Sequence, residues 1–97
     1  MTTNSKKIKV QILAPLSQYA DNQKMIESEG NDVEQVIERI AKKYPKLGEQ
    51  LFDPSSNSIR DFINIFRNGE DIRTTGGVAT NLAENDRITI MPAIAGG

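Results

Sequence analysis

One strongly amphipathic helix limits the folds that are open to this 97-residue chain. Asn31 is a good helix N-cap and forms a capping-box-like pair with Glu34, three residues later. Pro45 is expected to end the helix, because proline cannot continue the backbone hydrogen bonds. Between these signals the apolar residues recur at helical spacing in one stripe: Val33, Val36, Ile37, Ile40, Ala41 and Tyr44. A stripe of this kind has to be buried against another element of the fold.

The remaining segments predict short strands. Lys6 to Leu13 alternates between apolar and polar residues, and Asn68-Gly69 is a strong two-residue hairpin signal because both positions need positive φ. Residues 14–22 are predicted as a turn, 47–52 as a further helical turn, 53–58 as a loop and 74–80 as irregular. Leu82 is expected to reach the core. The predicted strands are 6–13, 24–28, 62–66, 70–73 and 87–91.

The order of elements predicts an α+β fold. Two strands, one main helix and three further strands give a mixed sheet of four to five strands, with the helix on one face and the other face partly open. If the first and last strands are adjacent and parallel at the centre, this is the β-grasp (ubiquitin-like) arrangement. Other small α+β sheets remain compatible with the same order. The length indicates a single domain, 1–97, with a flexible tail at 93–97.

The end of the chain is the segment that suggests chemistry. Pro92 lacks an N–H, so the last strand should stop there. The five residues after it are small and uncharged and could extend about 16 Å at roughly 3.3 Å per residue: Ala93, Ile94, Ala95, Gly96 and Gly97. A glycine at the terminus leaves its carboxylate unshielded by any side chain. The alternative is an ordinary frayed end without a chemical role.

Composition excludes several classes of function. The chain contains no cysteine and no histidine, which removes disulfides, thiol nucleophiles, the usual general base and the common metal sites. The net charge of −1 gives no reason to expect nucleic acid, and there is no apolar run of membrane-spanning length and no secretory signal. We therefore expect a cytoplasmic protein that is not an enzyme, with any catalyst supplied by a partner.

Three segments resemble the ubiquitin-like sulfur carriers of the MoaD/ThiS family: 67–73, 81–82 and 85–97. The family pattern is an x-N-G-x hairpin, an acidic turn before the last strand, and a Pro-Ala-hydrophobic-small-Gly-Gly end. The insert at 51–56 and the strand at 62–65 are most similar to the carrier of bacterial cysteine biosynthesis. Two residues depart from the pattern, since Arg67 stands where an aliphatic residue is commoner and Asn85 where glycine is usual.

The resemblance implies a mechanism. An ATP-dependent, E1-like activating enzyme would adenylate the Gly97 carboxylate, and a sulfur donor would convert the adenylate to a thiocarboxylate. A biosynthetic enzyme would then accept the sulfur, in cysteine or a related amino-acid pathway. No cofactor would be bound, because ATP belongs to the partner and the sulfur is carried covalently at Gly97. Gly96 would give clearance, and Pro92, Ala93, Ile94 and Ala95 would line the partner's channel.

A carrier of this kind also needs a docking face. If Ile63 and Ile65 face the helix, Phe62 and Phe66 lie on the open face of the sheet. Met91 lies opposite the Ile88 and Ile90 side of the last strand, so Phe62, Phe66 and Met91 are predicted to form an apolar partner-binding patch. The alternative is that the parity is reversed or that loops cover the aromatic rings.

Three other functions remain open at the level of the sequence. The nearest is the small subunit of molybdopterin synthase, which uses the same tail chemistry with a different acceptor. A second is a ubiquitin-like modifier that forms isopeptide bonds to lysines. A third is an interaction module in which Gly96-Gly97 has no chemical role.

Overall fold

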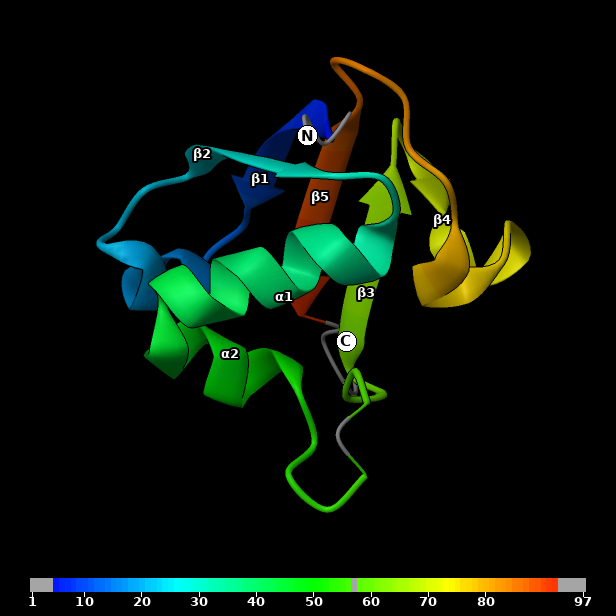
Figure 1. The fold of residues 1–97 in the computed structure, drawn as a ribbon. Helices are drawn as coiled ribbons and strands as arrows, with labels where there is room; N and C mark the ends of the chain where they lie inside the picture. The colour runs from blue at the N-terminus through cyan, green and yellow to red at the C-terminus, as the bar shows by residue number, and fades with distance from the viewer. Residues whose placement is uncertain (1–4, 57, 93–97) are drawn as a thin grey trace.

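The computed structural model describes residues 5–56 and 58–92 of the chain. Within these residues the strands are β1 (Lys6–Ile12), β2 (Met25–Gly30), β3 (Ile63–Arg67), β4 (Glu70–Asp71) and β5 (Arg87–Pro92), and the helices are α1 (Val33–Lys43) and α2 (Pro45–Leu51). The described strands form one mixed sheet in the order β2-β1-β5-β3-β4. Figure 1 shows α1 lying across one face of this sheet, with α2 beside it.

The two strands at the centre of the sheet decide its topology. β1 and β5 are adjacent and parallel, with Val10 opposite Ile88 and Ile12 opposite Ile90. β2 pairs antiparallel with the outer side of β1, and β3 pairs antiparallel with the outer side of β5. The first and last strands thus lie side by side, so the predicted α+β β-grasp fold is confirmed.

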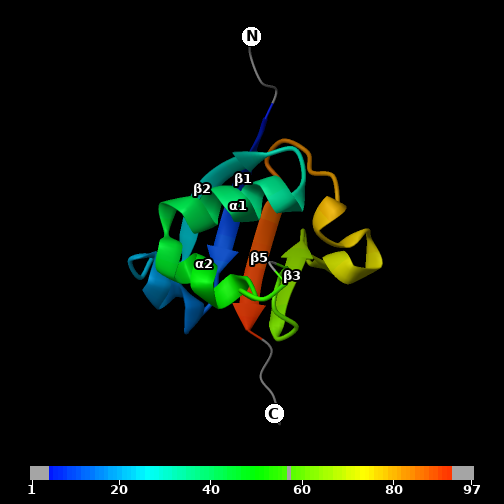
Figure 2. The same cartoon turned by 60° about the horizontal axis from the view of Figure 1, so that its bottom comes forward.

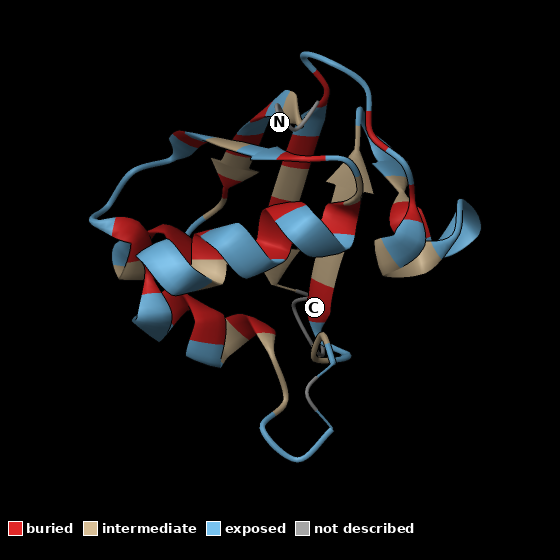
Figure 3. Cartoon of the chain, in the orientation of Figure 1, coloured by how far each residue is buried: buried red, intermediate tan, exposed pale blue. Residues whose placement is uncertain are grey.

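The core lies between the sheet and the two helices. Figure 3 shows buried residues on the sides of α1, α2 and the strands that face one another. The largest fully buried side chains come from β1, β5, α1 and α2: Ile8, Val10, Ile12, Val33, Val36, Ile37, Ile40, Leu47, Leu51, Ile88 and Ile90. Burial of this apolar surface supplies the main favourable free energy of folding. The predicted stripe on α1 is the part that packs against the sheet.

The start of α1 differs from the prediction by one residue. Asp32, not Asn31, is the N-cap, and its Oδ1 accepts a 2.9 Å hydrogen bond from the N–H of Gln35. The Gln35 side chain in turn accepts the N–H of Asn31 at 2.8 Å. The carbonyl of Asn31, the residue before the cap, accepts the N–H of Leu82 at 2.9 Å.

Pro45 ends α1 as predicted, and it also begins α2. Proline is well suited to the first turn of a helix, where its missing N–H has no partner to lose. Leu47 and Leu51 are buried beneath α1, so the predicted helical turn at 47–52 is a complete short helix. The two helices approach closely at Gly48, where an added Cβ would lie 2.9 Å from the Cβ of Ala41.

Several connecting segments are more ordered than predicted. Residues 14–22 contain a 3-10 helix, Leu16–Ala20, and residues 74–80 contain another, Gly77–Ala79. The predicted strand 70–73 ends after Asp71, because the Asp71 carboxylate accepts the N–H of Arg73 and starts a 3-10 turn. Asn68 and Gly69 have φ values of 50° and 87°, which confirms the predicted hairpin. Leu82 is buried, also as predicted.

Among residues 5–56 and 58–92, no helix has the length and apolar character needed to cross a membrane.

Candidate functional site

β5 is the element that leads to the C-terminal tail. It lies between β1 and β3 and is hydrogen-bonded on both sides. Figure 2 shows β5 running antiparallel to β3, so that the last residues of β5 lie beside the first residues of β3. Because Ile88 and Ile90 are fully buried, the strand that carries the tail is anchored in the core of the fold.

The register of β3 explains how proline is tolerated at the end of β5. Asn68 N donates to Arg87 O at 2.8 Å, which fixes the phase of the β3–β5 ladder. Hydrogen-bonded and non-hydrogen-bonded pairs alternate in antiparallel strands, so the Ile63–Pro92 pair falls at a non-hydrogen-bonded position. β3 therefore does not need the N–H that Pro92 lacks, and β5 extends one residue beyond the predicted range.

Pro92 is the last residue that the structure describes, and it is half-buried. The predicted site residues Ala93, Ile94, Ala95, Gly96 and Gly97 lie outside the described residues. Their assignment as the modified end of the chain stays a prediction from the sequence.

The side chains of β3 face the sides of the sheet that were predicted for them. Ile63 and Ile65 are 2% and 3% exposed on the helix side, whereas Phe66 is half-buried on the open side. Met91 is also half-buried and lies opposite Asn64, one position diagonal from Phe66. Phe62, the residue before β3, is 52% exposed, and its ring lies 5.8 Å from the guanidinium of Arg60. We call Phe62, Phe66 and Met91 the apolar patch; its role in binding a partner stays a prediction.

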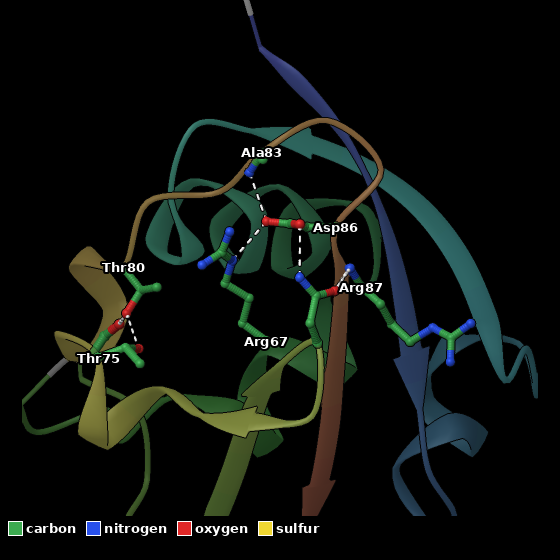
Figure 4. Close-up of polar contacts among 8 residues, drawn as sticks. Arg67, Thr75, Thr80, Ala83, Asp86 and Arg87 are labelled. Carbon is green, nitrogen blue, oxygen red and sulfur yellow. Dashed lines mark hydrogen bonds and ion pairs between the residues drawn. The ribbon is translucent and has the colours of Figure 1, made fainter.

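A buried carboxylate organises the other end of β5. Asp86 Oδ2 accepts hydrogen bonds from Arg67 Nε and from Ala83 N, both at 2.7 Å, and Oδ1 accepts one from Asn68 Nδ2 at 2.9 Å. Figure 4 shows Arg67 and Ala83 converging on Asp86. Burial raises the pKa of Asp86, but the hydrogen bonds from Ala83, Asn68 and Arg67 outweigh it and hold the pKa below its ordinary value.

This cluster was not predicted from the sequence, although a signal for it was present. Arg67 shares its parity with Ile63 and Ile65, so an arginine there points toward the core side of the sheet and needs an acidic partner. The turn 84–86 supplies that partner, and the departure of Arg67 from the family pattern is explained by Asp86. Asn85 has a φ of 68°, a conformation that asparagine adopts more readily than most residues, which explains how it replaces glycine.

The loop after α2 lies next to the start of β3 and has its own hydrogen bonds. Phe52 forms a β-bridge with Ile59, and Asp53 N donates to Ser58 O at 2.8 Å. Asp53 Oδ1 accepts from both the hydroxyl and the N–H of Ser55, and these bonds hold the pKa of Asp53 below its ordinary value. The base of the predicted loop at 53–58 is therefore closed by the hydrogen bond between Asp53 and Ser58.

Comparison with known proteins identifies the family. The sequence pattern described as the ThiS family matches residues 10–97. The chain belongs to the ThiS family. The sulfur carrier protein CysO of Mycobacterium tuberculosis is 38% identical over 91 residues, which cover 93% of this chain and 98% of that protein. The predicted resemblance to the MoaD/ThiS carriers is thereby confirmed.

Two solved structures show the same fold. The small archaeal modifier protein 1 of Methanosarcina acetivorans is 29% identical, with a TM-score of 0.89 over 98% of this chain and 100% of that one. A chain of the BexX/CysO complex of Amycolatopsis orientalis is 29% identical, with a TM-score of 0.83 over 93% of this chain and 99% of that one. This ThiS-family member is therefore a homologue of small carrier and modifier proteins along almost its full length.

Proposed function

We propose that this ThiS-family chain is a sulfur carrier in which Gly97 is the modified residue. The observation that carries the proposal is the similarity to CysO, a protein named as a sulfur carrier, along nearly the whole chain. The family pattern also extends through Gly96 and Gly97. We place its role in the synthesis of cysteine or a related amino acid, and its site of action in the cytoplasm.

The chemistry proceeds in two steps. An oxygen of the Gly97 carboxylate attacks the α-phosphorus of ATP, and pyrophosphate leaves. A sulfur donor then attacks the carbonyl carbon of the acyl adenylate, and AMP leaves, so that a thiocarboxylate remains. The first step is needed because a carboxylate is a poor electrophile until one oxygen becomes part of a good leaving group. The thiocarboxylate is then a soft nucleophile for an acceptor enzyme.

The carrier itself supplies position and recognition, not catalysis. It has no cysteine or histidine, so the nucleophiles and general bases of both steps come from partner enzymes. β5 is paired with β1 up to Ile90 and with β3 up to Pro92, which gives a partner a fixed point from which to receive Gly97. The apolar patch lies beside that point on the open face.

The partners in this proposal are an E1-like adenylating enzyme and a sulfur-accepting enzyme. The complex formed by CysO of Amycolatopsis orientalis with BexX supports the idea that a relative of this chain works bound to another protein. The half-buried Phe66 and Met91 and the exposed Phe62 are the groups that we assign to such contacts.

A ubiquitin-like modifier is the second candidate. The similarity to the small archaeal modifier protein 1 favours it, because the name of that protein describes modification and its fold matches this chain closely. Both functions begin with adenylation of Gly97 and differ in the nucleophile that follows. A sulfur donor yields a thiocarboxylate, whereas a lysine amine yields an isopeptide bond.

Intact mass spectrometry separates these outcomes. The purified chain is incubated with the E1-like adenylating enzyme of the same organism, ATP and sulfide. We expect the mass to rise by the difference between one sulfur and one oxygen atom. An unchanged mass under conditions in which the enzyme consumes ATP would contradict the carrier proposal. Lysine-linked products from the native cell would favour the modifier instead.

Deletion of Gly97 tests the assignment of the residue. We expect the shortened chain to keep the fold and the melting temperature of the full chain but to gain no sulfur. Lys42→Glu, on the exposed side of α1, serves as a matched variant that keeps the tail intact and should gain sulfur normally. If the shortened chain still accepts sulfur, Gly97 is not the site.

A further inference from the structure

A recess on the open face of the sheet gathers positive charge. It has a volume of about 490 Å³ and is lined by Lys9, Asn68, Gly69, Asn85, Arg87 and Thr89. Lys9 on β1 and Arg87 on β5 are direct neighbours in the parallel register. Both are exposed, whereas the next residues of their strands, Val10 and Ile88, are fully buried on the helix side. We call this the cationic recess.

The two cations face each other across neighbouring strands. Like charges in such positions repel each other, so an acidic group that bound between them would relieve the repulsion. Lys9 has Glu27 opposite it on β2, but Arg87 lies between Lys9 and the neutral Asn68. Among the described residues neither Lys9 nor Arg87 makes an ion pair within 4.0 Å.

The acidic residue next to Arg87 in the sequence is not available to it. Both oxygens of Asp86 are occupied by Arg67, Asn68 and Ala83. Figure 4 shows the side chain of Arg87 extending away from Asp86, on the opposite side from Arg67. The exposed guanidinium of Arg87 therefore does not share the carboxylate of Asp86.

The backbone around the recess is held in place by hydrogen bonds. Asn68 Oδ1 accepts the N–H of Arg87 at 2.9 Å, while Asn68 N donates to Arg87 O at 2.8 Å. Asn85 N donates to Lys7 O at 2.8 Å, and Lys9 N donates to Asp86 O at 3.0 Å. The walls that carry the two cations are thus fixed before any ligand arrives, which lowers the entropic cost of binding.

From this arrangement we infer that the cationic recess binds carboxylate side chains of the adenylating enzyme that receives the tail. The inference rests on the proposed function for the identity of the partner. Arg87, Thr89 and Met91 share one face of β5, so a protein seated on the apolar patch continues over the recess, roughly 13 Å away at about 3.3 Å per residue. Charge complementarity then selects acidic side chains, because the cations of Lys9 and Arg87 lie side by side there.

Charge reversal with a matched control tests the inference. Arg87→Glu and Lys42→Glu change the net charge equally, but Lys42 lies on the exposed side of α1, away from the recess. Binding of each variant to the E1-like adenylating enzyme is measured by calorimetry at low and moderate salt. The gain of sulfur is followed by intact mass spectrometry. Arg87→Gln serves as a second variant that removes the charge without reversing it.

We expect Arg87→Glu to weaken binding about tenfold or more at low salt, Arg87→Gln less, and Lys42→Glu less than about twofold. Wild-type affinity should fall as salt rises, and the affinity of Arg87→Glu should change little. Equal affinities for Arg87→Glu and Lys42→Glu, or a wild-type affinity that does not respond to salt, overturn the inference.

The two readouts separate this inference from the proposed function. If wild type binds with the expected salt dependence and Arg87→Glu binds more weakly than Lys42→Glu, but wild type gains no sulfur, the carrier proposal fails and the recess assignment stands. If wild type gains sulfur and Arg87→Glu binds as well as Lys42→Glu, the carrier proposal stands and the recess assignment fails. If wild type neither binds the enzyme nor gains sulfur, both the carrier proposal and the recess assignment fail.

Discussion

The ion pair between Arg67 and Asp86 joins the end of β3 to the turn before β5. The Nε of Arg67, at the end of β3, lies 2.7 Å from Oδ2 of Asp86, the residue directly before β5. The same carboxylate also accepts Asn68 of the hairpin and the N–H of Ala83, so one buried side chain fixes a strand end, a hairpin and a turn. Arg87, which follows Asp86 directly, is the residue that lies beside Lys9.

Replacing Asp86 by alanine should reduce stability. Arg67, Asn68 and the N–H of Ala83 would lose their shared acceptor in a buried environment, which costs about 1–3 kcal/mol in the free energy of unfolding. Urea denaturation measures the change. Glu38→Ala removes an exposed carboxylate from α1 and should change stability by less than about 0.5 kcal/mol. Equal effects of the two substitutions would show that Asp86 has no special structural role.

The contribution of Asp86 should depend on pH. Its pKa in the folded chain lies below its ordinary value, so the unfolded chain binds the proton more readily. The stability from this carboxylate is therefore present above the unfolded pKa of about 3.9 and is lost as pH falls through the folded pKa. The difference in unfolding free energy between wild type and Asp86→Asn should be largest above about pH 5 and shrink in more acidic solution.

Urea titrations at neutral and acidic pH measure that difference. Glu38→Gln is the control, because it removes the charge of an exposed carboxylate on α1. If the gap between wild type and Asp86→Asn widens on acidification, the folded chain does not hold the pKa of Asp86 below that of the unfolded chain.

The contrast between α1 and the Asp86 cluster shows what the sequence could predict. The stripe on α1 and the parity of Ile63 and Ile65 follow from the periods of helix and strand, which are local properties. The cap at Asp32 was missed by one residue because asparagine and aspartate suit the N-cap position equally well, so the sequence does not separate Asn31 from Asp32. The Asp86 cluster was missed for another reason, since its partners come together only when β3 and β5 pair.

The candidate site also contains parts that the sequence predicted and parts that it did not. The tail 92–97 and the residues of the apolar patch were predicted from composition, alternation and family resemblance. The cationic recess was not, because neither Lys9 nor Arg87 is unusual on its own in an exposed strand position. Only the parallel register brings the two cations together, and only the hydrogen bonds of Asp86 remove it as a counter-ion for Arg87.

Gly48→Ala should destabilise the contact between the two helices. Alanine normally stabilises a helix relative to glycine by about 0.5–1 kcal/mol. At Gly48 the new Cβ would meet the Cβ of Ala41 at 2.9 Å and its Cα at 3.3 Å, and neither atom belongs to a flexible side chain. We expect a net loss of about 1–3 kcal/mol from overpacking.

Thermal and urea denaturation of Gly48→Ala measure this loss. The double substitution Ala41→Gly with Gly48→Ala moves the methyl group to the other helix and should recover most of it. If Gly48→Ala alone is as stable as wild type, the helices separate more easily than their close approach indicates.

Phe62 offers the sharpest test of the apolar patch, because removing it should affect binding without affecting the fold. Its side chain is 52% exposed, so Phe62→Ala should change the unfolding free energy by less than about 1 kcal/mol. Met25 on β2 is a matched control, since it is also a large apolar residue and is 46% exposed, but it lies at the edge of the sheet far from β3. Calorimetric titration with the adenylating enzyme should show affinity about tenfold lower for Phe62→Ala and nearly unchanged for Met25→Ala, because aromatic residues dominate the energetics of interfaces. If both variants bind like wild type and gain sulfur normally, the partner does not use Phe62. The docking surface then has to be sought elsewhere on the sheet.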